Sequence, residues 1–126
     1  MFAFKKKYYL IIQSIKDIDL KNIKLVDKFT IIYRNNTKID NLIDLRRFRQ
    51  ECRRRKMDFF VANNPVLLIK LKADGLYISS HNRNLNLVKF KNQNFKIIGS
   101  AHNINEINIK NKQGCLSLIH ISEPTR

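Results

Sequence analysis

The sequence is poor in the residues that define several protein classes. Its 126 residues include two cysteines, three glycines, two prolines and no tryptophan. So little glycine and proline excludes collagen-like and linker-like chains. Cys52 and Cys115 provide neither a disulfide framework nor the spacing of a zinc site, so we expect a reducing, cytoplasmic environment. No apolar run approaches the roughly 20 residues of a membrane-spanning helix, so we expect no membrane partner.

Acidic residues are also scarce, with ten against 25 basic residues and a net charge of +15. Such a field favours polyanionic partners such as phosphorylated small molecules, nucleic acid or acidic lipid. A second cause competes with this one, because lysine, asparagine and isoleucine accumulate when AT-rich DNA is translated. The charge alone therefore does not choose between function classes. The 44% of hydrophobic residues is enough for a buried core.

Short apolar runs alternate with amphipathic stretches along the chain. The runs predict strands at 8–13, 29–34, 57–62, 74–79 and 95–100. The stretches between them predict helices at 40–56, 65–72 and 104–112, and short, weak ones at 17–27 and 84–90. This alternation favours a parallel sheet whose strands are buried on both faces. No GxGxxG or P-loop motif is present. We therefore predict an α/β fold, an incomplete TIM (β/α)₈ barrel with about five β/α units.

The stretch 40–56 is the clearest predicted helix, with Asp40 as its expected N-cap. Its apolar residues fall on one face: Leu42, Leu45, Phe48 and Cys52. We expect the arginines of the segment RRFRQECRRRK (46–56) to form its solvated outer face. An alternative is that this segment binds nucleic acid, because it is basic enough to grip phosphates. No RRM, KH or zinc-finger pattern accompanies it, so we favour the solvated face.

Five segments resemble motifs of the thiamine-phosphate synthase/TenI family, in the family's order. YYLIIQ (8–13) resembles Y-L-I-T, IIYRNN (31–36) resembles Q-x-R-x-K, FVANNP (60–65) resembles I-I-N-D-R, ADGLYISS (73–80) resembles A-D-G-V-H-L-G-Q, and IIGSAH (97–102) resembles I-I-G-x-S-x-H. The resemblance covers residues 8–114 and implies a TIM barrel. It also implies the family reaction, which joins hydroxymethylpyrimidine diphosphate to thiazole phosphate and releases pyrophosphate.

The resemblance assigns roles to residues at the ends of predicted strands, where TIM-barrel active sites are assembled. It implies that Arg34 and Ser100 contact the diphosphate and that Asn63 contacts the pyrimidine. Asn36 and Ser80 occupy two further substrate-binding positions. His102 stands where TenI-type relatives carry a histidine that can move protons during thiazole tautomerisation, which suits an imidazole near neutral pH.

The chain departs from the family pattern at its charged positions. The family's lysine is Asn36 here, and its two Mg²⁺-binding aspartates correspond to Asn64 and Asn82. Mg²⁺ prefers anionic oxygen ligands, so the resemblance implies this cofactor but these residues make its binding doubtful. Two other functions therefore stay open beside a synthase with a degenerate metal site. One is a TenI-like thiazole tautomerase, and the other is a catalytically inactive family member.

The last eleven residues, LSLIHISEPTR (116–126), resemble nothing in this family. They match the translation of a transposase adapter used to prepare sequencing libraries. We therefore predict a partial thiamine-phosphate synthase/TenI-like barrel at 1–115 and a non-native tail at 116–126. The loops after strands 7 and 8 usually form the phosphate site of a barrel, and five units lack them. We expect activity in an intact parent protein and none in this chain by itself.

Overall fold

Six parallel strands form one sheet in the computed structural model, which describes residues 8–24 and 29–119. The spatial order of the strands follows the chain: β1 Tyr8–Ile12, β2 Phe29–Tyr33, β3 Asp58–Ala62, β4 Gly75–Ile78, β5 Lys96–Ser100 and β6 Ser117–Ile119. The α-helices are α1 Leu42–Arg54, α2 Pro65–Leu71 and α3 Ile104–Lys112. Short 3₁₀ helices are η1 Ile15–Asp17, η2 Leu20–Asn22 and η4 Leu85–Gln93.

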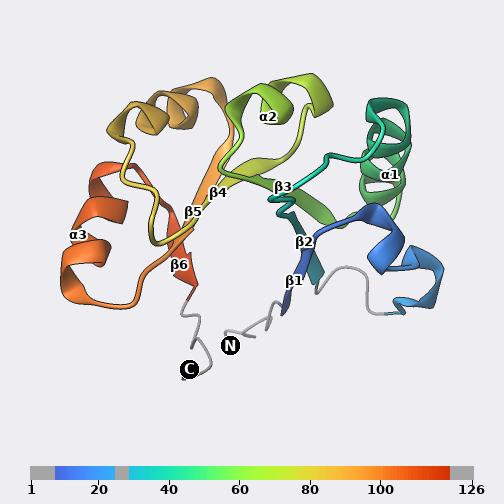
Figure 1. Ribbon diagram of the computed structural model, residues 1–126, viewed down its shortest axis with the longest axis horizontal. Coiled ribbons are helices and arrows are strands. Elements are labelled where there is room, and N and C mark those ends of the chain that lie inside the picture. The colour runs from blue at the N-terminus through green and yellow to red at the C-terminus, as the bar shows by residue number, and fades with distance from the viewer. Residues whose placement is uncertain (1–7, 25–28, 120–126) are drawn as a thin grey trace, which may run out of the picture.

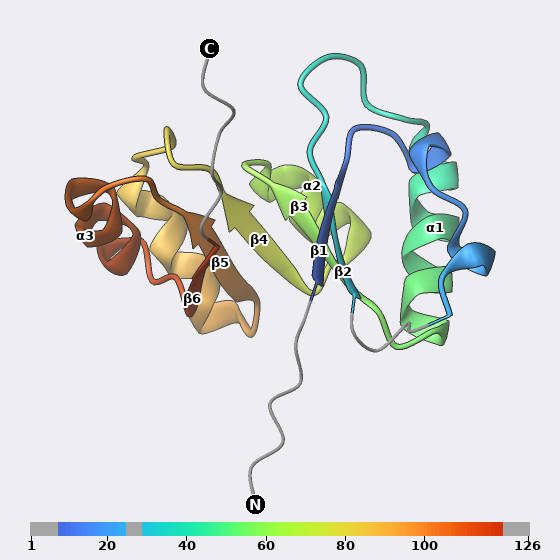
Figure 2. The same ribbon diagram turned by 90° about the horizontal axis from the view of Figure 1, so that it is seen from below.

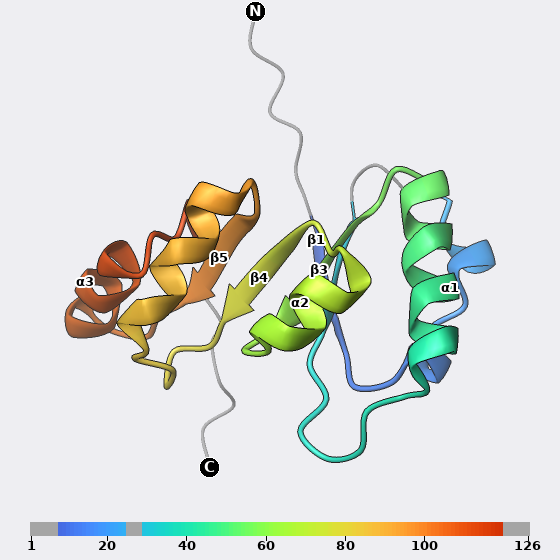
Figure 3. The same ribbon diagram turned by 90° about the horizontal axis from the view of Figure 1, so that it is seen from above.

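The sheet is curled, with the strands on the concave side and the helices on the convex side (Figure 1). Seen from above, α2 and η4 lie in front of the strands, and α1 and α3 lie on either side of them (Figure 3). Seen from below, β1, β2 and β6 face the viewer, and none of the described helices covers the sheet on that side (Figure 2). A TIM barrel has the same arrangement of inner strands and outer helices. The predicted α/β half-barrel is therefore confirmed.

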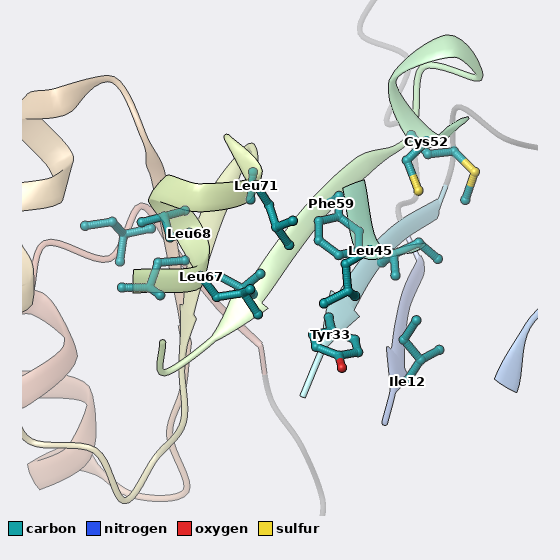
Figure 4. Close-up of a cluster of buried hydrophobic side chains, with 14 of the residues drawn as sticks. Ile12, Tyr33, Leu45, Cys52, Phe59, Leu67, Leu68 and Leu71 are labelled. Carbon is teal, nitrogen blue, oxygen red and sulfur yellow. The ribbon is translucent and has the colours of Figure 1, made fainter. Parts of the chain in front are cut away.

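Both faces of the central strands are buried, as their continuous apolar runs predicted. Successive side chains of a strand point to opposite faces, so Phe59 faces the helices and Phe60 faces the concave side. The outer cluster packs β1–β5 against α1 and α2, with Leu45 and Leu68 fully buried (Figure 4). The inner cluster contains one large side chain from each of four strands: Ile32, Phe60, Tyr77 and Ile98.

Strand β1 is less buried than predicted. Tyr8, Tyr9 and Ile11 are between 36% and 45% exposed, because β1 pairs only with β2 among the described residues and so lies at an edge of the sheet. At the opposite edge, β6 adds a sixth strand beside β5, where the sequence predicted five units. Sheet pairing is made by backbone groups and places few demands on side chains. The assignment of residues 116–126 to a non-native tail therefore stays a prediction.

The N-cap of helix α1 lies one residue later than predicted. Asn41 is the N-cap, and its side chain accepts a hydrogen bond from the Ile43 N–H at 2.8 Å. The Asp40 carboxylate instead accepts hydrogen bonds from the Ser14 hydroxyl, the Ile15 N–H and the Tyr33 hydroxyl, at 2.9, 3.1 and 3.0 Å. Asp40 thus connects the loop after β1 to β2, which a local sequence pattern does not reveal.

The position of Arg49 also differs from the prediction. This residue was expected on the solvated face of the helix, and it is only 4% exposed. It lies four residues after Leu45 and three before Cys52, so it shares their buried face. Its Nη2 atom lies 3.0 Å from Asp74 Oδ1, and its Nε donates to the Lys72 carbonyl at 3.2 Å. The guanidinium therefore connects α1 to the turn between α2 and β4.

The weak helices were predicted with the right location and the wrong form. In place of one helix at 17–27, the structure has η1, which begins before this range, and η2. Residues 25–27 of the range lie outside the described residues. The helix predicted at 84–90 is η4, which is a 3₁₀ helix. In the part of the chain that the structure describes, no helix is both long enough and apolar enough to cross a bilayer.

Candidate functional site

The carboxyl ends of β2 to β5 meet at one edge of the curled sheet. Arg34 directly follows β2, Asn63 follows β3, Ser80 comes two residues after β4, and Ser100 ends β5. The strands are parallel and neighbouring ends are level, since Tyr33 pairs with Val61 and Ile78 pairs with Gly99. The structure thus brings these residues to the same edge. We call it the rim, defined as Arg34, Asn63, Ser80, Ser100 and His102.

Asn63 holds the loops after β3 and β4 together. Its Oδ1 accepts hydrogen bonds from the Ser79 N–H and from Asn82 Nδ2, both at 3.0 Å, and its Nδ2 donates to the Ser79 hydroxyl at 3.1 Å. Asn63 has a φ of 57°, a left-handed conformation that asparagine tolerates better than most residues. One of the two Nδ2 hydrogens has no role in these three bonds, so Asn63 can still donate to a ligand.

Ser100 is held by a residue from the concave face. The Tyr77 hydroxyl donates to Ser100 Oγ at 2.9 Å, and both residues are at most 2% exposed. Because the tyrosine is the donor in this bond, the hydroxyl hydrogen of Ser100 remains available to an acceptor at the rim. The inner cluster of the half-barrel therefore orients a potential ligand-binding hydroxyl.

His102 and Glu106 form an imidazole–carboxylate pair at the end of β5. The backbone N–H of His102 donates to Glu106 Oε1 at 2.7 Å, and the ring nitrogen Nδ1 of His102 lies 3.2 Å from the same oxygen. Glu106 is 8% exposed and lies in the first turn of α3. A carboxylate at Nδ1 favours the tautomer that carries its proton on that nitrogen. The His81 ring lies 6.3 Å from the His102 ring, centroid to centroid.

The hydrogen bond from the His102 N–H lowers the pKa of Glu106, and this effect outweighs burial, which acts in the opposite direction. A carboxylate with a lowered folded-state pKa stabilises the fold above its unfolded pKa, and the contribution is lost as pH falls through the folded pKa. We therefore expect Glu106→Gln to flatten the loss of stability below about pH 4.5. Urea denaturation between pH 3 and pH 7 measures this, and parallel curves for the two proteins would contradict it.

Asn64 and Asn82, at the positions of the family's metal-binding aspartates, have structural partners instead. Asn64 caps α2, with its Oδ1 accepting the Leu67 N–H at 3.0 Å. Asn82 Oδ1 accepts the Asn84 N–H at 3.0 Å, while its Nδ2 holds Asn63. Across residues 8–24 and 29–119, no group of three or more His, Cys, Asp or Glu residues is placed to hold a metal. Neutral, occupied carboxamides do not fit the anionic ligand preference of Mg²⁺.

Arg34 and Asn36 both lie in the turn after β2, where Arg34 is half-buried and Asn36 is exposed. Asn35 organises the turn by accepting the Thr37 N–H at 2.8 Å. The Arg34 N–H donates to the Ile12 carbonyl at 2.8 Å, which fixes its backbone. Its Nε atom is buried without a hydrogen-bond partner in the described residues. An unpaired buried donor costs free energy, so this atom is suited to an anionic ligand.

The rim residues are hydrogen-bonded to residues that the sequence motifs did not indicate. Tyr77 and Ser79 lie in or beside β4, and nothing in their spacing shows that they reach Ser100 and Asn63. Glu106 did leave a signal, because it follows Asn103 by three residues at the start of a predicted helix, as in a capping box. Asn103 Oδ1 accepts the Glu106 N–H at 2.9 Å.

The two cysteines are unsuited to nucleophilic chemistry. Burial raises the pKa of Cys52 to about 12 and the pKa of Cys115 to about 11. A thiol with such a pKa is almost entirely protonated near neutral pH, and only the thiolate is a good nucleophile. The groups available for chemistry are therefore the arginine, hydroxyl, amide and imidazole groups of the rim.

Comparison with known proteins gives a structural similarity and no match by sequence. Neither the protein-family models nor the curated proteins match the chain. Among solved structures, the chain is similar to thiamine phosphate pyrophosphorylase from Pyrococcus furiosus, with a TM-score of 0.65 and 20% sequence identity over 94% of this chain. The chain spans 61% of the length of that protein. It therefore shares the fold of part of that enzyme.

Proposed function

We propose that the rim binds phosphorylated pyrimidine and thiazole molecules and that the protein acts in thiamine biosynthesis, as a relative of thiamine-phosphate synthase. The structural similarity to a thiamine phosphate pyrophosphorylase supports this proposal. The observation that carries it is the gathering of hydrogen-bond donors at one sheet edge. Arg34 supplies an unpartnered buried Nε, and Ser100 supplies a hydroxyl hydrogen. Such donors match the acceptor oxygens of a phosphate or diphosphate.

The rim residues divide into groups that hold charge and a group that moves a proton. Release of pyrophosphate leaves negative charge on its oxygens, which Arg34 and Ser100 would stabilise from fixed positions. Asn63 would donate its remaining amide hydrogen to the pyrimidine. We propose that Asn64 and Asn82 hold no Mg²⁺, since their side-chain oxygens cap α2 and close the loop after β4.

A second candidate function is isomerisation of thiazole phosphate, as in TenI-like tautomerases. The His102–Glu106 pair favours it, because an imidazole oriented by a carboxylate is well placed to accept and return a proton. Binding of thiazole phosphate is common to both candidates. His102 moves a proton in this second candidate and does not anchor phosphate, so it should be dispensable for binding.

Calorimetric titration of the chain with thiazole phosphate and with the pyrimidine diphosphate tests the proposal. We expect saturable binding with one site for each molecule, not tightened by Mg²⁺. Arg34→Gln should weaken binding roughly tenfold or more, the usual effect of losing a hydrogen bond to a charged group. Arg47→Gln is the matched control, since Arg47 is exposed on α1 and the variant loses the same charge. His102→Ala should bind as the wild type does. Equal weakening by Arg34→Gln and Arg47→Gln, or no saturable binding, would contradict the proposal.

A further inference from the structure

A basic groove of about 390 Å³ lies between α1 and α2 on the outer, helical side of the sheet. It is lined by Arg46, Gln50 and Arg53 of α1, by Lys70 and Lys72 at the end of α2, and by the buried Arg49. The two helices are neighbours on this side of the sheet (Figure 3), and residues of the two are in contact. None of the described acidic side chains lines the groove. It therefore concentrates positive charge from two helices in one small volume.

The exposed cations of this groove have no acidic partner within residues 8–24 and 29–119. In the described part of the chain, no acidic residue forms an ion pair with Arg46, Arg53 or Lys70, whereas Arg54 and Arg55, on the same helix, are both paired with Glu51. Arg46 and Arg53 are seven residues apart, which places them on the same side of α1 about 10 Å from each other. Cations held together in this way repel one another and attract anions.

Arg49 gives the groove a fixed wall with a spare donor. Its Nη2 is paired with Asp74 at 3.0 Å, and Asp74 also accepts the Phe59 N–H at 2.8 Å. Arg49 Nε holds the carbonyl of Lys72 at 3.2 Å, so the turn that carries Lys72 is anchored to α1. The remaining nitrogen, Nη1, is buried and has no hydrogen-bond partner within the described residues. A buried guanidinium nitrogen without a partner is a second, independent indication of an anionic ligand.

We propose that the basic groove binds a small polyphosphorylated anion. Its volume falls in the range of small-molecule sites, roughly 300–1,000 Å³. Proteins that bind single-stranded nucleic acid combine a cationic track with aromatic rings for base stacking, and none of the aromatic side chains that the structure describes lines this groove. The groove lies near the amino ends of β3 and β4, because Arg53 and Lys72 closely precede them in the chain. It is thus at the opposite end of the strands from the rim, and the inference does not depend on the proposed function.

Titration of the chain with inorganic tripolyphosphate tests this site. We expect one groove site, weaker at 150 mM than at 20 mM salt because ions screen exposed charges. Arg46→Gln/Arg53→Gln should weaken this binding roughly 100-fold, about tenfold for each charged hydrogen bond lost. Arg47→Gln/Arg54→Gln loses the same charge from other positions on α1, and Glu51 keeps Arg55 as its partner. This control should bind within about twofold of the wild type.

Three results would overturn the inference. Equal weakening in both double variants would show attraction by net charge alone. If Arg34→Gln lost binding and Arg46→Gln/Arg53→Gln bound as tightly as the wild type, the anion would be placed at the rim. Tighter binding of a 12-nucleotide single-stranded RNA than of tripolyphosphate, abolished by Arg46→Gln/Arg53→Gln, would make the groove a nucleic-acid surface. Because thermal unfolding of each variant is recorded alongside, a loss of binding in a folded variant is distinguished from a loss of fold.

Discussion

Gly75→Ala is expected to lower the free energy of unfolding by about 3 kcal/mol, at the upper end of the usual cost of overpacking. A Cβ at this position would lie 2.2 Å from the Lys96 carbonyl oxygen and 2.5 Å from the Phe60 ring. The carbonyl belongs to the backbone of β5, so the clash is relieved only if β4 and β5 move apart. Urea denaturation followed by circular dichroism measures the change.

Gly99→Ala is the matched comparison for this prediction. Its new Cβ would meet Lys110 Cδ at 2.7 Å and Cys115 Sγ at 2.8 Å, and both are side-chain atoms that can move. We expect a loss of about 1–2 kcal/mol. A loss at Gly75 no greater than the loss at Gly99 would contradict the close approach of β4 and β5 that forms this part of the sheet.

Arg49→Met is expected to destabilise the fold by about 3 kcal/mol, the lower end of the cost of removing one partner of a buried ion pair. Arg49 is almost fully buried, and Asp74 keeps 28% of its side chain exposed, which moderates the effect. The variant leaves the Asp74 carboxylate with the Phe59 N–H as its remaining partner among these contacts. Chemical denaturation at pH 7 measures the loss.

Arg53→Met is the control for this second prediction, since Arg53 is exposed on the same helix. It should change stability by less than about 0.5 kcal/mol. Adding Asp74→Asn to Arg49→Met removes the unpaired charge and should restore part of the stability. If Arg49→Met and Arg53→Met had equal effects, the guanidinium would not connect α1 to the turn before β4.

The fold was largely predictable because its main signals are local. Continuous apolar runs predicted β2 to β5, and Pro65 predicted the first turn of α2. The parallel arrangement followed from the alternation of strands and helices. The exposure of β1 did not follow, because a run such as YYLII has the same pattern in an edge strand and in a central one.

The errors concern polar residues whose partners are distant in sequence. Arg49 was placed on the solvated face with its neighbouring arginines, although its spacing puts it on the face of Leu45 and Cys52. What the sequence did not reveal is Asp74, 25 residues away, which pairs with the buried guanidinium. Asp40 was expected to cap α1, and it instead binds Ser14, 26 residues earlier. Local propensity predicts the helix but does not predict which distant residue a polar side chain will contact. These two partners could therefore not be predicted from the sequence.

The candidate site was predictable as a set of positions and not as a set of contacts. The family resemblance indicated Arg34, Asn63, Ser100 and His102, and the parallel strands bring them to one edge. The residues that orient them, namely Tyr77, Ser79 and Glu106, come from packing within the half-barrel. Tyr77 and Ser79 carry no motif, and the only sign of Glu106 is its spacing three residues after Asn103. The ligand roles of the rim residues remain predictions.

We propose that the carboxyl ends of β2 to β5 together form one ligand-binding edge. Backbone amide chemical shifts, recorded by NMR while thiazole phosphate is added to the chain, test it most directly. We predict that saturable shifts cluster at Arg34, Asn63, Ser80, Ser100 and His102, with little change in the basic groove. Shifts confined to α1 and α2, or spread without saturation over the basic surface, would contradict the claim.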